Sequence, residues 1–294
     1  MYTDSKAYLD KEEQEELSIL LGNIQYIINS YGKWDSIHDT KLEYTSSDFE
    51  LLYYSKGGSI TKINGIEYQC KPGMIVVIEP FSLVSTTNQG YETYEYYSIH
   101  FDIQPAYLQV QLTNLLVSNG PMIEKDEYTD ISGMFAKLYL EKLKKNIGYI
   151  SVITSGLLRI IVEIIRVQQE RNPLPVQQIE YDQQQVQTIN HALCYIDNHK
   201  SDAIKITAIC TAIGVSNSYL YKSFITIMGI SPSKFILQFK IKKAKELLRL
   251  NTYSVTEIGL LLGFSSTYHF SNTFKSITNI TPKKYRLTEL STLK

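Results

Sequence analysis

The stretch GFSSTYHFSNTFKSITNITPKKY, residues Gly263–Tyr285, has the pattern of a helix that ends, turns and begins again. An earlier stretch, GVSNSYLYKSFITIMGISPSKF at Gly214–Phe235, shows the same pattern. The first glycines of the two stretches lie 49 positions apart, and Phe224 and Phe274 lie 50 apart. Self-similarity over such a length is typical of a duplicated supersecondary unit. The C-terminal part of the chain is therefore predicted to contain one helical unit twice.

Each copy can be built as two helices joined by a tight turn. In the first copy, Gly214 permits the positive φ of the turn, and Ser216 can cap the next helix by accepting a backbone N–H. In the second copy, Gly263 makes the turn and Ser265 or Ser266 provides the cap. The apolar residues expected to face inward are Ile206, Ile209, Ala212, Leu220, Phe224, Phe270 and Phe274.

This arrangement is that of a helix-turn-helix, whose second helix enters the major groove of DNA with its N-terminal residues on base edges. An ordinary pair of packed helices is the alternative for each copy taken alone. Charge favours DNA: the chain from Asp182 onward carries 14 Lys and Arg against 6 Asp and Glu, whereas residues 1–181 carry 15 against 24. The residues predicted to contact double-stranded DNA are Asn217, Ser218, Tyr221, Lys222, Thr267, Tyr268, Ser271, Asn272 and Lys275.

The segment VTEIGLLLGFSSTYHFSNTFKSITNITPKKYR, Val255–Arg286, resembles the DNA-binding domain of AraC/XylS-type bacterial transcription regulators. The resemblance covers the C-terminal ~105 residues and rests on the patterns I-x-x-x-x-G-F, F-x-x-x-F-K and T-P-x-x-Y-R. Three residues depart from the family pattern: Gly259 replaces a common Ala, Asn272 a common basic residue, and Asn279 a common Gly. Because Lys222 occupies the basic position in the first copy, we expect that copy to bind DNA more tightly.

The N-terminal part of the chain has a different sequence pattern. Apolar residues at spacings of three and four predict an opening helix that Gly32 ends. From about Trp34 to Phe101, β-branched and aromatic residues alternate with turn signals, among them Asn64–Gly65, a strong hairpin signal. Helical spacing returns at about 130–146 and 150–169, where the apolar stripes can pack in the core or pair with a second copy. The apolar residues of the opening helix are Leu17, Leu20, Leu21, Ile24, Ile27 and Ile28.

The segment Phe49–Pro80 resembles the cupin-like barrel that often serves as the sensor in this family. The predicted fold is therefore α+β: a small antiparallel β-barrel with flanking helices at 1–172, a linker at 173–185, and an all-α domain with two helix-turn-helix motifs at 186–294. The first domain is expected to sense a small molecule and form a homodimer. Aromatic residues suit such a pocket, and Trp34, Tyr53 and Tyr94 are the candidate ligand contacts; plain core and exposed strand are the alternative.

No cofactor or metal is expected. The three cysteines are too scattered for a zinc site, and His38 and His100 are the histidines of the barrel region, expected to be hydrogen-bonded structural residues. The chain shows no catalytic constellation, so we expect a regulator and no enzyme. The alternatives are a ligand-independent architectural DNA binder and a cupin-type enzyme. The resemblance also implies RNA polymerase as a partner.

The longest apolar run, Gly156–Val167, is short and is broken by Arg159 and Glu163, so no membrane span is expected. The N-terminus lacks the apolar core of a signal peptide. These features predict a cytoplasmic protein. The effector, the operator and the choice between activation and repression are left open.

Overall fold

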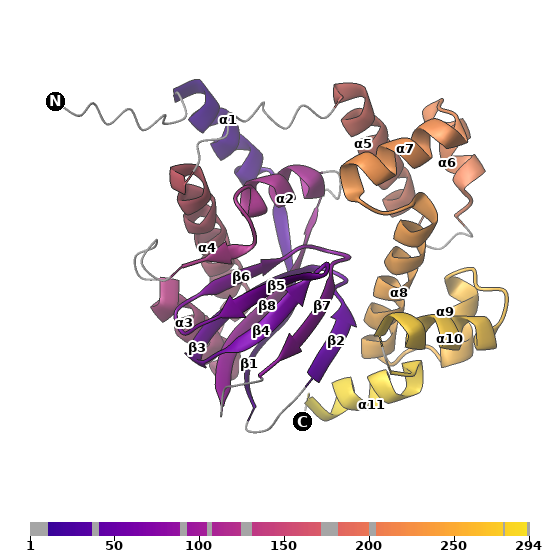
Figure 1. Cartoon of the computed structure of the whole chain (residues 1–294). Helices are drawn as coiled ribbons and strands as arrows, with labels where there is room; N and C mark the ends of the chain where they lie inside the picture. Colours follow the sequence, from indigo (N-terminus) through magenta and orange to yellow (C-terminus); the bar gives the residue numbers. More distant parts are fainter. Residues whose placement is uncertain are drawn as a thin grey trace. The chain divides into compact units, whose positions relative to one another are not determined.

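The chain divides into two compact units, Met1–Glu180 and Tyr181–Lys294 (Figure 1). No helix within the described residues has the length and apolar character needed to cross a membrane. The computed structural model describes residues 11–36, 41–88, 93–104, 108–124, 131–171, 182–199, 204–278 and 280–292.

Two antiparallel sheets form the centre of the N-terminal unit. One has the strand order β1-β8-β3-β6-β9 and the other the order β2-β7-β4-β5. Within the described residues no strand of one sheet pairs with a strand of the other, so the predicted barrel is here a pair of separate sheets and is not closed. The strands are β1 Gln25–Ser36, β2 Lys41–Thr45, β3 Phe49–Gly57, β4 Ser59–Ile63, β5 Ile66–Cys70, β6 Ile75–Ile78, β7 Leu83–Thr87, β8 Tyr94–Gln104 and β9 Met122–Ile123.

The predicted Asn64–Gly65 hairpin is confirmed. It joins β4 to β5, and both turn residues have positive φ, 51° and 87°. Such angles belong to the turns whose twist matches that of the flanking strands.

The opening helix is shorter than predicted. Helix α1 (Lys11–Gly22) ends ten residues before Gly32, and β1 follows it. Strand β1 pairs with β8 along its whole length, with a register shift between Ile28 and Ser30. This bulge puts Tyr26, Ile28 and Tyr31 on the same core. The strand therefore lacks strict alternation, and its apolar spacing imitates that of a helix.

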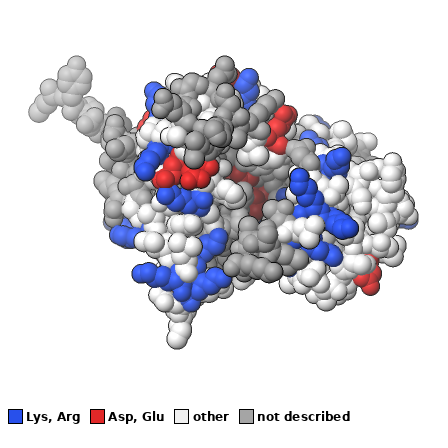
Figure 2. Space-filling model, turned by 90° about the horizontal axis from the view of Figure 1, so that it is seen from below, with Lys and Arg blue, Asp and Glu red and all other residues white. Residues whose placement is uncertain are grey.

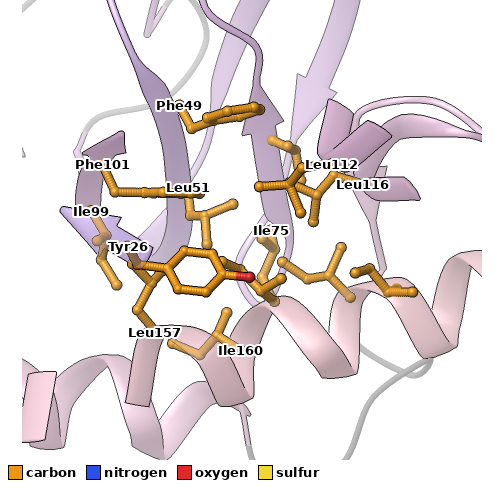
Figure 3. Packing of buried hydrophobic residues seen from close by; sticks show 14 of the residues in the cluster. Tyr26, Phe49, Leu51, Ile75, Ile99, Phe101, Leu112, Leu116, Leu157 and Ile160 are labelled. Atoms are coloured by element: carbon orange, nitrogen blue, oxygen red, sulfur yellow. The ribbon is translucent and has the colours of Figure 1, made fainter. Parts of the chain in front are cut away.

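The larger core lies between the five-stranded sheet and the helices α2 (Gln109–Val117), α3 (Ile131–Lys144) and α4 (Tyr149–Arg171). The apolar stripes of α3 and α4 are therefore used mainly in core packing. Figure 3 shows strand residues meeting α2 and α4 in this core. The labelled residues are Tyr26, Phe49, Leu51, Ile75, Ile99, Phe101, Leu112, Leu116, Leu157 and Ile160.

A second, smaller core lies between the two sheets. Because side chains alternate along a strand, Leu52 and Tyr54 of β3 point away from the helices and meet Ile63 and Val84 of the other sheet. Glu50, at the same alternate position near the start of β3, also lies on this face.

The C-terminal unit is helical. Helix α5 packs against α6 and α7, and α8 packs against α7, α9, α10 and α11. Helix α5 begins at Gln183, capped by the Asp182 side chain, so it starts within the range predicted as a linker. Most of that range lies outside the described residues. The helices are α5 Gln183–Asn198, α6 Ile206–Ile213, α7 Asn217–Met228, α8 Pro232–Leu250, α9 Val255–Leu261, α10 Thr267–Thr278 and α11 Pro282–Thr292.

Candidate nucleic-acid interface

A glycine turn joins α6 to α7. Gly214 has φ 72°, and its N–H donates to the carbonyl of Cys210. The Ser216 hydroxyl accepts the N–H of Tyr219 at 3.1 Å, which caps α7. Both sequence predictions for this turn are confirmed. Ala212, expected to face inward, is exposed, and the buried small residue of α6 is Cys210.

Helix α7 has one buried face and one exposed face. Leu220, Ser223 and Phe224 are fully buried, and Ile227 is largely buried. The four residues predicted to contact DNA from this helix are all exposed, and Tyr221 is 53% exposed. They are Asn217, Ser218, Tyr221 and Lys222.

The turn from α9 to α10 is built in the same way. Gly263 has φ 66°, and the Ser266 hydroxyl accepts the N–H of His269 at 3.1 Å. Ser266 is therefore the cap, while the Ser265 hydroxyl lies 3.1 Å from Nδ1 of His269. The helices pack closely here, because a Cβ on Gly259 would lie 3.2 Å from the Cβ of Phe270.

A capping box fixes the start of α9. The backbone N–H of Ser254 donates to Oε2 of Glu257 at 2.7 Å, and the backbone N–H of Glu257 donates to the Ser254 hydroxyl at 3.2 Å. The hydrogen bonds from Ser254 hold the pKa of Glu257 below its usual value.

Helix α10 exposes fewer of its predicted contacts than α7. Phe270 and Phe274 are fully buried. Tyr268 is 77% exposed, and Asn272 and Lys275 are also exposed. Thr267 and Ser271, two further predicted contacts, are half-buried.

The caps Ser216 and Ser266 set the alignment of the two helices. Counting from each cap, Lys222 of α7 corresponds to Asn272 of α10, and Ile225 of α7 corresponds to Lys275 of α10. Each helix therefore carries one exposed lysine. Relative to the cap, the lysine of α10 lies three residues, nearly one helical turn, farther along than that of α7.

Helix α8 connects the two pairs. Phe235 lies 5.5 Å from Phe224 between ring centroids, and farther along α8 Ile241 and Leu248 share a core with Phe270 of α10. A helix of 19 residues spans about 28 Å. Because α8 packs against both α7 and α10, it links the two helix pairs within the unit.

Helix α11 closes this core. Tyr285 meets Phe274 edge-on at 5.6 Å, and the Arg249 guanidinium lies 5.9 Å from the Tyr285 ring centroid. Arg286 donates to the carbonyl of Tyr253 at 2.5 Å. Arg286, in the TPKKYR motif, thus also serves packing, and the exposed lysines of the motif are Lys283 and Lys284.

Figure 2 shows one face of the molecule, on which Lys and Arg side chains are more prominent than acidic ones.

The three predicted ligand contacts do not line a single site. The exposed Trp34 donates from its indole Nε1 to the Ser98 hydroxyl at 3.0 Å, and Tyr94 lies buried on the same face of the sheet. Tyr53 points to the opposite face, where it stacks on Phe135 of α3 at 5.2 Å. The alternation of side chains along β3 and β8 causes this separation.

A buried polar cluster lies on the inner face of the same sheet. Nδ1 of His100 lies 3.2 Å from Oδ1 of Asp48 and 3.6 Å from Oε1 of Glu50. Tyr44 and Ser46 donate their hydroxyls to Glu50 at 2.6 and 2.7 Å. Burial raises the pKa of Glu50, and the neighbouring His100 opposes this rise. His100 is hydrogen-bonded, as predicted, while His38 lies outside the described residues.

Sequence reasoning missed the two carboxylates of this cluster. The only local signal is the D-x-E pattern Asp48–Glu50 at the opening of an otherwise apolar strand.

Comparison with known proteins agrees with the helical geometry. Residues 209–288 match a family described as a helix-turn-helix domain. The C-terminal unit contains an AraC-type helix-turn-helix domain. This AraC-type domain includes both turns and both caps described above.

The relatives found by sequence match part of the chain. The xylose operon regulatory protein of Escherichia coli K12 is 33% identical over 128 residues, which are 44% of this chain and 31% of that protein. A helix-turn-helix regulator encoded in the cgkA 5′ region of Pseudoalteromonas carrageenovora is 34% identical over 100 residues, which are 34% of this chain and 59% of that protein. The chain thus matches about a third of the first relative and somewhat more than half of the second.

Solved structures extend the likeness to both units. ToxT from Vibrio cholerae has a TM-score of 0.59 at 14% identity, covering 88% of this chain and 97% of ToxT. A ToxT structure with unsaturated fatty acid bound has a TM-score of 0.58 at 14% identity, covering 90% of this chain and 94% of ToxT. At such identity the likeness concerns the fold alone.

Proposed function

We propose that the chain is a sequence-specific DNA-binding transcription regulator whose N-terminal unit senses a small-molecule effector. In this proposal α7 and α10 enter adjacent major-groove segments on one face of the DNA. In this proposal, residues 1–172 sense the effector and form the dimer, residues 173–185 are a linker, and residues 186–294 bind DNA.

The observation that carries the proposal is the repeated turn in the C-terminal unit. Two separate helices begin at a serine cap directly after a glycine turn and bury their phenylalanines against α8 or the core it shares. Both leave polar residues outward near their starts, and each carries one exposed lysine, near the start of α7 and farther along in α10. A recognition helix contacts base edges through residues near its N-terminus, and both helices expose residues there, among them Ser218 of α7 and Tyr268 of α10.

The sensing role rests on the two-sheet unit. Two facing antiparallel sheets are the arrangement of jelly rolls, the class to which cupins belong, which supports a cupin-like sensor. The ToxT structure with an unsaturated fatty acid bound supports a small-molecule effector for a chain of this overall fold. Effector binding would shift the population between arrangements of the DNA-binding units.

We propose that the chain acts as a homodimer and contacts RNA polymerase when bound to DNA. Exposed apolar residues at the junction of α3 and α4 support a second copy as partner of the N-terminal unit. They are Leu143, Ile147 and Ile150.

Selection from a library of random DNA duplexes tests the proposal. The full chain should enrich a defined sequence, and fluorescence anisotropy should show binding to it at least ~10³-fold tighter than to shuffled duplexes at physiological salt. Affinity for both should fall steeply as salt rises, because released counterions drive phosphate binding. Equal affinity for every duplex would replace the proposal with architectural DNA binding, and no binding at low salt would overturn it.

Thermal unfolding with a panel of small molecules tests the sensor. A ligand that binds only the folded state must raise the unfolding midpoint. A regulator of the proposed kind should respond to a subset of chemically related compounds, whereas a ligand-independent DNA binder responds to none.

A further inference from the structure

We infer that Asp48, Glu50 and His100 form a binding site for one divalent transition-metal ion inside the N-terminal unit. The inference goes beyond the proposed function, since it concerns this cluster alone and would hold for a chain that never binds DNA.

Strand pairing brings the three side chains together. Glu50 of β3 and His100 of β8 are directly opposite in the antiparallel register, so their side chains leave the sheet on the same face. Asp48 precedes β3 by one residue, and its Oδ1 also lies beside the imidazole. One potential ligand atom from each residue lies within 4.8 Å of the others.

The spacing fits a small cation. Metal–ligand bonds of about 2.1 Å to imidazole nitrogen and carboxylate oxygen separate neighbouring ligand atoms by about 3.0 Å in octahedral and about 3.4 Å in tetrahedral sites. The His100 Nδ1 atom lies 3.2 Å from Asp48 and 3.6 Å from Glu50. Two of the three ligand-atom separations therefore already suit a single ion, and all three atoms lie within 4.8 Å of one another.

Burial gives the cluster its preference for a cation. Asp48 is 6% and Glu50 2% exposed, so both carboxylates are largely removed from water. Two ionised carboxylates at this separation repel each other, and desolvation adds to the cost. One imidazole supplies at most a single positive charge, whereas a divalent ion balances both carboxylates.

Neighbouring donors fix the carboxylates. Tyr44 and Ser46 each donate to an oxygen of Glu50, and Asn29 donates to Oδ2 of Asp48 at 2.7 Å and to Oδ2 of Asp102 at 2.8 Å. Asn29 stands at the bulge of β1, which aims its side chain into the cluster. Outer contacts of this kind orient the ligands of metal sites.

The donor set selects the class of ion. One imidazole with two carboxylates suits Zn²⁺, Mn²⁺ or Fe²⁺ better than Mg²⁺, which prefers oxygen and retained water. Three protein ligands leave further positions for water or an effector atom, as in open zinc sites. The His100 side chain is 27% exposed, which gives an ion a route to the site.

Metal uptake by the full chain, freed of any affinity tag and stripped with EDTA, tests the inference. Samples equilibrated with ZnCl₂, MnCl₂ or MgCl₂ are passed over a desalting column, and bound metal is measured by mass spectrometry. We expect one Zn²⁺ or Mn²⁺ per chain and none with Mg²⁺. Cobalt(II) should add visible absorption bands, because a protein site lowers the symmetry around the ion.

Variants locate the site. His100→Gln and Glu50→Gln should each abolish stoichiometric uptake, and Ser46→Ala should weaken metal affinity by roughly tenfold or more. The matched control is His191→Gln, at an exposed histidine of the C-terminal unit, which should take up metal like the wild type. Circular dichroism checks that each variant is folded. If Glu50→Gln unfolds the protein, the metal uptake of His100→Gln decides the test, because His100 is the most exposed of the three ligands.

Equal uptake by wild type and a folded His100→Gln variant would overturn the site. So would the absence of Zn²⁺ and Mn²⁺ from the wild type, which would leave His100 as the hydrogen-bond partner of Asp48. DNA binding is not part of this readout, so its success or failure in the earlier experiment leaves this result unaffected.

Discussion

The two helix pairs of the C-terminal unit share a turn and a cap but differ in where they place positive charge. In α7 the exposed lysine is Lys222, close to the helix start, while α10 has Asn272 there and carries Lys275 further along. The local geometry is thus duplicated and the contact surface is not. The difference indicates that the turn uses a glycine and a serine in both copies, whereas the proposed DNA contacts use different residues in each copy.

Substitution of the turn glycines should have the largest effect. Gly263→Val and Gly214→Val each force a β-branched residue into positive φ, which should lower the free energy of unfolding by about 1–3 kcal/mol or more. Asn tolerates this conformation, so Gly263→Asn and Gly214→Asn are the matched controls. Thermal unfolding followed by circular dichroism measures the effect. A Gly263→Val protein as stable as the wild type would contradict the positive-φ turn at Gly263.

Loss of the caps should come next. Ser216→Ala and Ser266→Ala each remove the acceptor for one backbone N–H, at a cost of about 1 kcal/mol. Denaturant unfolding should show similar losses for the two, because the caps are alike. Ser265→Ala is the control. A larger loss of stability for Ser265→Ala than for Ser266→Ala would mean that Ser265, and not Ser266, caps the helix.

Lysine substitutions should separate the two helices. Lys222→Ala is expected to weaken DNA binding several-fold and to lower the salt slope by about one. Lys275→Ala should have a smaller effect, since Lys275 lies farther from the helix start that enters the groove. Anisotropy titrations at several salt concentrations test this order. A greater loss for Lys275→Ala would mean that α10 provides the stronger contact, contrary to the expectation from the sequence.

The capping box of α9 should give the smallest effect, and only the second pair has it. Because the pKa of Glu257 is lowered in the folded chain, its contribution to stability is present above the usual pKa of a glutamate and is lost as pH falls through the folded pKa. Glu257→Gln should flatten this part of the stability–pH curve measured by thermal unfolding. An unchanged curve would assign the acid response to other groups.

Local rules made the C-terminal unit predictable. The glycine turns and serine caps act over a few residues, so sequence alone placed Gly214, Ser216 and Gly263. Ala212 was misplaced because a short helix gives few turns from which to fix its buried face. Thr267 and Ser271 were taken as outward, but packing leaves them half-buried.

In the N-terminal unit, the features that the sequence did not predict depend on pairing between strands that are far apart in the chain. The bulge at Asn29 broke the alternation of β1 and made its apolar residues resemble a helix. Whether strands close into a barrel depends on partners far apart in the chain, and the structure has two sheets instead. Asp48 and His100 are 52 positions apart and meet only because β3 pairs with β8.

The central claim is that α7 and α10 both read DNA, and the sequences selected by variants test it most directly. Random-duplex selection should give the wild type two preferred segments about one helical turn apart, the spacing of major grooves on one DNA face. Tyr221→Ala should relax preference in one segment and Tyr268→Ala in the other, each by about 1–3 kcal/mol at the affected bases. Relaxation of the same segment by both variants, or of neither, would contradict the account.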